Sequence, residues 1–325
     1  MSIAGSKILV TGGAGLVGSH VVDELVRSGA SEVVVYDSLV RGHPHHLEWA
    51  QANGNVTLVV ADLRDTERLV ETVGGCRYVC HQAAAWLRQC QREPRMSLEV
   101  NIAGTFNLLE ACVANGVEKL VAASSSSVYG EGSYLPTDEK HPLLNDLFYG
   151  ASKVANEQFY TCFHKQYDLD YVAFRYLNVY GPRQPFDAAY TDVIMNFLDR
   201  IDAGEPPRVR GDGSATVDLV YAGDVARANV MAFESELSGE VLNVCSGVET
   251  SVKQLAELLI RMRGKEGQLT PAFEPMDSGL VQRRWGDPGK AEELLGFRAT
   301  TPLEEGLAKV IEWREQTKAQ RSAPH

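Results

Sequence analysis

A glycine-rich stretch near the N-terminus, KILVTGGAGLVGS at residues 7–19, constrains the fold of this chain more than any other segment. A short apolar run at 8–10 precedes Gly12, Gly15 and Gly18, and a helical pattern begins among the glycines. In such a strand–turn–helix unit, the first glycine permits a tight turn, the second lets the backbone approach a pyrophosphate, and the third lets the helix pack against the strand. The unpaired N–H groups at the start of the helix would hold the phosphates. The stretch predicts a dinucleotide-binding unit, with a plain strand–helix turn as the alternative.

An acidic residue after the next strand indicates which dinucleotide this unit binds. The strand EVVVY at 32–36 ends in Asp37, at the spacing of about 20 residues that such units show. A carboxylate there accepts hydrogen bonds from the adenine-ribose hydroxyls and repels a 2′-phosphate. We therefore expect NAD as the cofactor rather than NADP, although Arg41 lies close enough to weaken this preference.

Composition excludes several other classes of protein. The chain has 325 residues, of which 44% are hydrophobic and 23% charged, as expected of a globular protein with two modest domains. Its net charge of −12 argues against nucleic acid and anionic membrane surfaces as partners, and its apolar runs are too short to span a bilayer. The N-terminus lacks the pattern of a secretory signal. Six scattered cysteines indicate reduced thiols in a cytoplasmic protein and no metal site, and RGHPHH at 41–46 is expected to be a solvated loop.

Strand and helix patterns alternate up to about residue 178. Strands are expected at 56–61 and 119–123, a strand that runs into a small-residue loop at 78–85, and helices at 66–73, 98–115 and 149–167. This order predicts an α/β fold with a doubly wound parallel sheet. Short strands and loops rich in glycine and proline follow, so we expect a smaller C-terminal α/β lobe. The predicted division is 1–178 for the NAD-binding Rossmann domain with the catalytic residues, and 179–325 for a mostly substrate-binding lobe whose segments partly return to the first domain.

Tyr149 and Lys153 form the candidate catalytic pair, because residues four apart on a helix face the same way. A tyrosine pKa is normally near 10. A lysine ammonium one turn away and a positively charged nicotinamide ring would favour the phenolate and lower this pKa towards neutral. Tyr149 could then act as general base for an alcohol, with a hydroxyl of the serine run 124–127 on the same oxygen. The spacing alone more often marks one face of an amphipathic helix, but its place downstream of the nucleotide turn favours catalysis.

Together these motifs resemble the extended short-chain dehydrogenase/reductase family, in its NAD-dependent nucleotide-sugar epimerase and dehydratase branch, and within it the UDP-glucose 4-epimerase-like members. The resemblance runs from residue 7 to about residue 313. Its motifs are TGGAGLVGS, HQAA at 81–84, SSVYG at 126–130, YGASK at 149–153, RYLNVYGPRQ at 175–184 and DLVYAGDVA at 218–226.

The resemblance implies roles for individual residues. Ser125, four residues before Tyr129, is the expected catalytic hydroxyl together with Tyr149 and Lys153, and Ser124 could share its work. Asp62, just past a strand, could contact the adenine amino group or cap a helix, and Trp86 could line the sugar pocket or pack in the core. The expected cofactor-binding residues are Gly12, Gly15, Leu16, Val17, Asp37, Asp62, Leu63, Ala83, Ala84, Asn101, Ser124, Tyr149 and Lys153. The expected substrate-binding residues are Trp86, Ser126, Asn178, Arg183, Val209, Arg210 and Arg284.

The serine segment indicates which reaction of the branch to expect. The 4,6-dehydratases and the decarboxylases that resemble them carry an acidic residue just after the catalytic hydroxyl, whereas Ser126 and Ser127 stand here. Without an acid to protonate a leaving hydroxyl, a 4-keto sugar can only take its hydride back, and C4 is inverted if the sugar turns over first. We therefore expect C4 epimerisation of a UDP-sugar with NAD regenerated in each cycle. The alternatives are another NDP-sugar conversion (a decarboxylase, dehydratase or reductase) and a non-catalytic NAD-binding regulator.

Two departures from the family pattern concern arginines. Val217 stands where the family often has an arginine that grips the diphosphate, so Arg210, Arg283 or Arg284 would have to supply that charge. Arg284 lies near the position that limits the C2 substituent in galactose epimerases, and its charge indicates a phosphate or carboxylate contact instead.

Apolar stripes on the predicted helices 98–115 and 149–167 indicate a subunit contact. In the family such helices pair across a two-fold axis, so we expect a homodimer. Packing inside the monomer would explain the same stripes.

Overall fold

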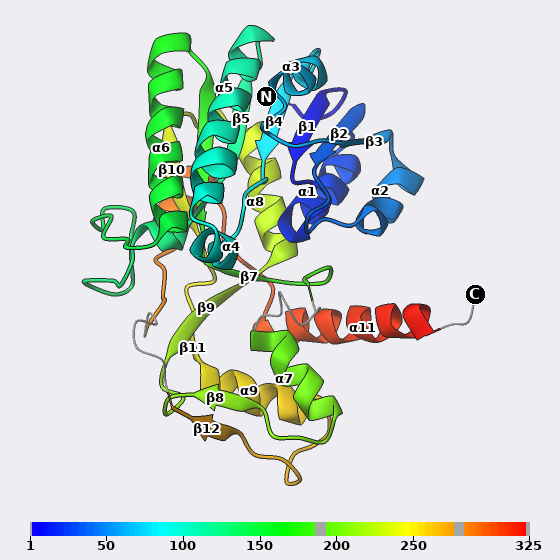
Figure 1. Ribbon diagram of the computed structural model, residues 1–325, viewed down its shortest axis with the longest axis vertical. Helices are drawn as coiled ribbons and strands as arrows, with labels where there is room; N and C mark the ends of the chain where they lie inside the picture. The colour runs from blue at the N-terminus through cyan, green and yellow to red at the C-terminus, as the bar shows by residue number, and fades with distance from the viewer. Residues whose placement is uncertain (1, 186–192, 276–282, 323–325) are drawn as a thin grey trace.

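The computed structural model describes residues 2–185, 193–275 and 283–322. At its centre lies a seven-stranded sheet in which every neighbouring pair is parallel, in the order β10-β6-β5-β4-β1-β2-β3 (Figure 1). The strands are β1 (Lys7–Thr11), β2 (Glu32–Asp37), β3 (Val56–Val60), β4 (Tyr78–His81), β5 (Lys119–Ser125), β6 (Asp170–Tyr176) and β10 (Glu240–Val244). The predicted doubly wound parallel sheet is confirmed.

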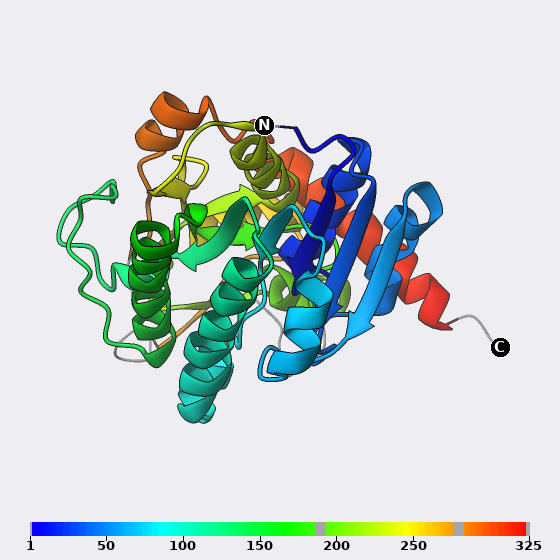
Figure 2. The same ribbon diagram turned by 90° about the horizontal axis from the view of Figure 1, so that it is seen from above.

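Helices cover both faces of this sheet (Figures 1 and 2). Because side chains alternate along a strand, Ile8 and Val10 of β1 pack in one core while Leu9 packs in the other. The first core also holds residues of α1 and α8, and the second holds residues of α3, α5 and α6. These helices are α1 (Leu16–Arg27), α3 (Thr66–Val73), α5 (Gly104–Ala114), α6 (Phe148–Tyr167) and α8 (Ala222–Glu234).

A smaller lobe with its own hydrophobic core lies below the sheet in Figure 1. Two small sheets, β11-β9-β7 and β12-β8, pack there with α7, α9 and α11. Their bounds are β7 (Asn178–Tyr180), β8 (Arg208–Arg210), β9 (Thr216–Tyr221), β11 (Glu249–Ser251), β12 (Ala272–Glu274), α7 (Val193–Asp202), α9 (Val252–Met262) and α11 (Leu303–Ser322). Because α8 and β10 return from this half of the chain to the large sheet, the two halves are interwoven.

Short elements connect the layers. They are α2 (Glu48–Asn53), α4 (Leu87–Arg92), α10 (Gly289–Leu295), a 3-10 helix at Pro44–Leu47 and another at Ser126–Val128. The expected solvated loop at 41–46 is wrong in part, because proline is well tolerated at the first position of a helix and His46 is buried. The His46 Nδ1 atom lies 2.9 Å from the carbonyl oxygen of Ala14 in the glycine turn.

Two other expected elements can be compared with the structure. The segment 78–85, predicted as a strand that runs into a small-residue loop, is a strand up to His81, and the Asn101 side chain binds both the N–H and the carbonyl of Ala85 in the loop that follows. The helix predicted at 98–115 is a π-helix at Ser97–Ala103 that continues into α5. Within the described residues, no helix is both long and apolar enough to cross a membrane.

Candidate active site

A cavity of about 520 Å³ lies at the carboxyl ends of the central strands. Its walls come from the glycine turn, the end of β2, the loop after β4, the serine segment after β5, the start of α6 and the segment after β6. Most of the predicted site residues meet here: Gly12, Gly15, Leu16, Val17, Asp37, Asp62, Leu63, Ala83, Ala84, Trp86, Ser125, Ser126, Tyr149, Lys153, Asn178, Arg183 and Arg284. Four predicted site residues do not line it: Asn101, Ser124, Val209 and Arg210.

The glycine turn has the shape of a cradle for a pyrophosphate. Gly12 has a φ of +67°, and a Cβ added there would lie 2.7 Å from the backbone nitrogen of Ala83. A Cβ on Gly18 would lie 2.2 Å from the carbonyl oxygen of Gly12. No side chain caps α1 at Gly15, so the first N–H groups of the helix remain available to an anion. A dinucleotide fits this turn, and bulkier residues at the first and third glycines would not.

Asp37 lies at the end of β2, where an adenine ribose would be bound. Its Oδ2 accepts the N–H of Ala14 at 2.9 Å, and its Oδ1 accepts the N–H of Leu39 at 2.8 Å. Burial raises the pKa of this carboxyl, and the two backbone hydrogen bonds oppose the rise. Because each carboxylate oxygen can accept a second hydrogen bond, Asp37 retains acceptors for two ribose hydroxyls.

Asp62 lines the cavity as an ion pair. Its carboxylate accepts two hydrogen bonds from the Arg64 guanidinium, both at 2.9 Å, and one from the Arg64 N–H. These contacts lower the pKa of Asp62. An adenine amino group at this place would therefore meet a carboxylate that is already neutralised, so the proposed contact of Asp62 is weaker than a free carboxylate would give.

Ser125, Tyr149 and Lys153 meet where β5 ends and α6 begins. Tyr149 and Ser125 both line the cavity, and the Ser125 hydroxyl acts to lower the pKa of Tyr149. The Lys153 Nζ donates to the carbonyl of Ala123 at 2.8 Å and lies 5.7 Å from the centre of the Tyr149 ring. This geometry places a phenol, a hydroxyl and an ammonium on one wall of the cavity, as acid–base chemistry at an alcohol requires.

The expected lowering of the Tyr149 pKa does not hold for the protein alone. Burial raises the pKa of Tyr149 to about 12, and the nearby Ser125 hydroxyl and Arg41 charge only reduce the rise. Burial also lowers the pKa of Lys153 to about 8, which weakens the lysine as a source of positive charge. Burial thus outweighs the opposing effects of Ser125 and Arg41, so the pKa of Tyr149 stays above its ordinary value in the protein alone.

Ser124 and Asn101 are buried behind the wall instead of lining the cavity. Ser124 Oγ donates to Glu157 Oε1 at 2.5 Å. Successive strand residues point to opposite faces, so Ser124 and Ser125 cannot both reach the substrate. The Asn101 amide is used by the backbone of Ala85 and by Ser152 Oγ, so its role is to shape the loop after β4.

Val209 and Arg210 lie in the smaller lobe, outside the cavity. Val209 is fully buried in the core of that lobe, and Arg210 is exposed at the end of β8. Asn178 does line the cavity, although its amide donates to the carbonyl of Asp218 at 3.2 Å. The geometry therefore gives no support to substrate contacts from Val209 or Arg210.

Of the arginines expected to hold an anion, Arg284 is the best placed. Arg183 is ion-paired with Asp23 at 2.7 Å, and Arg283 is paired with Glu249 at 2.7 and 2.8 Å. Among the residues that the structure describes, the Arg284 guanidinium has neither a hydrogen-bond partner nor a counter-charge. Burial lowers its pKa, and it lies beside the serine segment where two hollows of the surface meet. A substrate anion would supply the charge that this half-buried cation lacks.

Sequence reasoning missed a buried ion pair that holds the catalytic elements together. Arg175 on β6 donates to both carboxylate oxygens of Glu157 on α6, at 2.9 and 2.7 Å. Its third nitrogen donates to the hydroxyl of Tyr129, which donates to Asn243 on β10. The available signal was the position of Glu157, one turn beyond Lys153 on the same helix face.

His81 fills a buried site between β1 and α5 and should make stability depend on pH. Its ring nitrogens lie 2.7 Å from Thr11 Oγ1 and 2.9 Å from Thr105 Oγ1, and burial lowers its pKa to about 3. Below pH 6.5, the pKa of histidine in the unfolded chain, the unfolded chain binds a proton at His81 that the folded chain does not bind. Stability contributed by neutral His81 is therefore lost as pH falls from 6.5 towards 3, by about 2 kcal/mol at pH 5.

Urea unfolding of the parent and of His81→Gln at several pH values checks this expectation. Glutamine keeps hydrogen-bonding groups but does not titrate, so its stability should fall less steeply, by about 1.4 kcal/mol per pH unit for the one proton removed. His20 and His46 also have pKa values lowered by burial, to about 4 and about 3, and remain in both proteins. Equal slopes would mean that His81 protonates normally in the folded state.

Comparison with known proteins assigns the family. A profile described as "NAD dependent epimerase/dehydratase family" matches residues 8–245. The UDP-glucose 4-epimerase of Mycolicibacterium smegmatis is 35% identical over 311 residues, covering 94% of this chain and 98% of that protein. A UDP-N-acetyl-alpha-D-glucosaminuronate decarboxylase of Bacillus cytotoxicus is 29% identical over 321 residues, covering 94% and 97%.

Solved structures give the same assignment. The UDP-glucose 4-epimerase of Thermotoga maritima, determined with UDP-glucose, matches with a TM-score of 0.89 and 36% identity, covering 96% of this chain and 99% of that one. With the glycine cradle, Asp37 and the Ser125–Tyr149–Lys153 wall in one cavity, the chain belongs to the NAD-dependent epimerase/dehydratase family of enzymes.

Proposed function

We propose that this enzyme inverts C4 of a UDP-sugar through a transient 4-keto sugar. When bound, NAD supplies the hydride chemistry, accepting hydride from C4 and returning it. Tyr149 removes the proton of the C4 hydroxyl and later gives it back, Ser125 orients that oxygen, and Lys153 holds the ribose and favours the phenolate. If the 4-keto sugar rotates in the cavity between the two proton transfers, hydride returns to the opposite face of C4 and the configuration inverts.

The observation that carries this proposal is the absence of an acid beside the catalytic hydroxyl. Ser126 and Ser127 follow Ser125, and among the cavity-lining residues that the structure describes the carboxylates are Asp37 and Asp62. Both lie at the ends of strands on the adenosine side, away from Tyr149. Dehydration would need a carboxylic acid near the sugar, so return of hydride is the simpler outcome. The similarity to UDP-glucose 4-epimerases supports the same reading.

Arg284 is proposed to bind an anionic group of the substrate. Within the described residues its guanidinium has no partner, which suits either the diphosphate or a carboxylate on the sugar. A contact between Arg284 and a sugar carboxylate would favour an alternative reaction on a UDP-uronate. The decarboxylase of Bacillus cytotoxicus is a relative named for a uronate substrate. A non-catalytic regulator is disfavoured because the serine, tyrosine and lysine are all present and line one cavity.

The reaction can be tested with the purified enzyme and no added cofactor. UDP-glucose, UDP-N-acetylglucosamine and UDP-glucuronate are incubated separately, and the anomeric protons of the products are followed by NMR. We expect one pair of C4 epimers to interconvert with no net reduction of the cofactor. Products that have lost water or carbon dioxide would overturn the proposal.

Arg284→Gln should separate the two possible anions. If Arg284 binds the diphosphate, kcat/KM should fall by about tenfold to a hundredfold for every UDP-sugar, because one charge-assisted hydrogen bond is lost. If it binds a sugar carboxylate, only turnover of UDP-glucuronate should fall. Arg283→Gln is the matched control, since Arg283 is paired with Glu249 outside the cavity. Unchanged kinetics with all three substrates would remove Arg284 from the site.

We further propose a cytoplasmic homodimer that pairs through α5 and α6. Leu98, Phe148 and Tyr167 are 51%, 56% and 55% exposed near these helices, which supports a further contact. Part of the predicted apolar stripe packs within the monomer, because Phe106 packs edge-on against Phe159.

Six free cysteines support a reducing compartment. We also propose that the chain divides into two domains at residue 178, with α8 and β10 returning to the first domain.

A further inference from the structure

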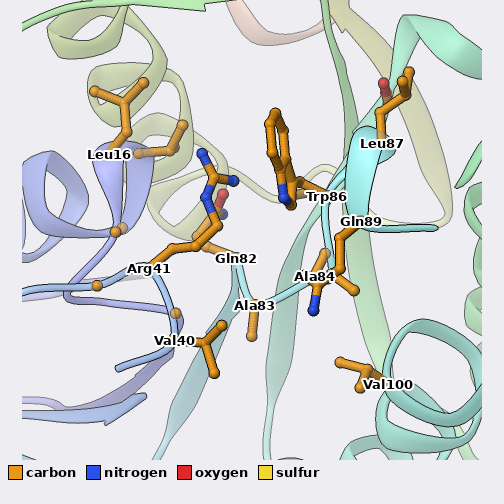
Figure 3. Close-up of a pocket in the computed structure, with 18 of the residues that line it drawn as sticks. Leu16, Val40, Arg41, Gln82, Ala83, Ala84, Trp86, Leu87, Gln89 and Val100 are labelled. Carbon is orange, nitrogen blue, oxygen red and sulfur yellow. The ribbon is translucent and has the colours of Figure 1, made fainter. Parts of the chain in front are cut away.

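Arg41 and Trp86 form a stack inside the cavity that the proposed reaction does not use. They approach from opposite sides, Arg41 from the segment after β2 and Trp86 from the loop after β4 (Figure 3). The guanidinium carbon of Arg41 lies 4.4 Å from the centre of the Trp86 ring. At this distance the electron-rich face of the indole attracts the cation and holds its plane in place.

The backbone carrying Arg41 is fixed on the glycine turn. The N–H of His43 donates to the carbonyl of Ala14 at 3.0 Å. A Cβ on Gly42 would lie 2.8 Å from Asp37 Oδ1 and 2.9 Å from the Cβ of Ala14, so this segment presses against both the turn and the ribose carboxylate. The starting point of the Arg41 side chain is therefore set by the same residues that form the dinucleotide site.

Within the described part of the chain, four other cations line the cavity: Lys153, Arg64, Arg183 and Arg284. Lys153 donates to the carbonyl of Ala123, Arg64 is paired with Asp62, and Arg183 is paired with Asp23. Arg284 lies at the other end, beside the serine segment. Arg41 lines the same cavity as Leu16 and Val17 at the start of α1, and its charge acts to lower the pKa of Tyr149.

We propose that Arg41 clamps the pyrophosphate of NAD against the N-terminus of α1, with the Trp86 ring as its support. The N–H groups of the helix would bind one side of the pyrophosphate and the guanidinium the other. Because the ring orients the guanidinium beforehand, little side-chain freedom is lost on binding. Tight retention of NAD is what an enzyme that regenerates its cofactor in every cycle requires. In this assignment Trp86 acts through Arg41 and not through the sugar.

The test measures dinucleotide binding with no sugar present, so it rests on the NAD dependence of the family and not on the proposed reaction. Calorimetric titrations of cofactor-stripped protein with NAD⁺, ADP, adenosine and UDP are compared for the parent and three variants. Arg41→Gln should weaken NAD⁺ and ADP by about 10- to 100-fold and leave adenosine and UDP unchanged. Trp86→Leu should weaken NAD⁺ by about 3- to 10-fold, because the support but not the charge is lost.

Arg88→Gln is the matched control. Its guanidinium carbon also lies over the Trp86 ring, at 5.9 Å, but the side chain is exposed and does not line the cavity. NAD⁺ affinity should stay within about twofold of the parent. The proposal is overturned if Arg41→Gln leaves NAD⁺ affinity unchanged, or weakens adenosine as much as ADP. A loss confined to UDP would also overturn it, because Arg41 would then serve the diphosphate of the substrate.

Discussion

Replacing Tyr149 with phenylalanine should lower kcat by about a thousandfold, within the range that a general acid–base group contributes. Phenylalanine keeps the ring at the start of α6 and removes only the hydroxyl that would act as acid and base. Binding of NAD and UDP-glucose should change little, since the loss concerns proton transfer. Single-turnover measurement of cofactor reduction would place the defect in the first chemical step. Retention of even a tenth of the parent kcat would show that another group takes the proton.

Two neighbouring serines provide a control for this prediction. Ser125→Ala should lower kcat by about 10- to 100-fold, because the substrate oxygen loses a hydrogen bond made during the reaction. Ser124→Ala removes the same atom one residue earlier, where the hydroxyl donates to Glu157 behind the wall. Its kcat should remain near that of the parent, with a modest loss of stability. Equal effects on kcat would contradict the placement of the two serines on opposite faces.

Replacing Glu157 with leucine should lower the free energy of unfolding by about 3–5 kcal/mol, because Arg175 would be left as an unpaired buried charge. Arg175 makes both of its charged contacts to Glu157, and its side chain is only 7% exposed. Urea unfolding followed by circular dichroism gives this value. Since Glu157 is one turn beyond Lys153, the variant should also loosen α6 against β6 and lower activity.

The double variant Arg175→Met and Glu157→Leu distinguishes two contributions to the free energy of unfolding: the penalty of one unpaired buried charge, and the net stabilisation from the ion pair. Replacing both partners with apolar side chains of similar size often costs little. The double variant should therefore recover most of the stability lost by Glu157→Leu alone. A double variant as unstable as the single one would show that the hydrogen bonds to Tyr129 and Ser124, and not charge compensation, dominate this network.

Local patterns predicted the elements whose signals lie within a few residues. The helix Thr66–Val73 was predicted with the observed bounds, and Asp65 caps it by accepting the N–H of Arg68. The place of Asp37 at the end of the second strand was predicted from its spacing after the last glycine, and its carboxylate accepts the N–H of Ala14 in the glycine turn. The π-helix before α5 was missed, since its apolar spacing resembles that of an ordinary helix.

Partners distant in the sequence could not be predicted in the same way. The sequence does not distinguish the candidate anion-binding arginines, which are Arg183, Arg210, Arg283 and Arg284. Their tertiary contacts do, because Arg183 pairs with Asp23 and Arg284 lies beside the serine segment. The sign of the Tyr149 pKa shift likewise depends on burial, which the four-residue spacing to Lys153 does not report. By contrast, the burial of Ser124 could have been predicted from the sequence, because strand alternation places it opposite Ser125.

The return of α8 and β10 to the large sheet has a consequence for synthesis on the ribosome. β10 pairs with β6, and α8 packs against α1, so the sheet stays open along β6 until residue 244 has left the ribosome. Until then, a row of unpaired backbone groups and an apolar face of α1 remain exposed in the nascent chain. The nucleotide-binding half therefore cannot complete its folding during translation ahead of the rest. A chaperone that shields the β6 edge would be needed until β10 has left the ribosome and paired with β6.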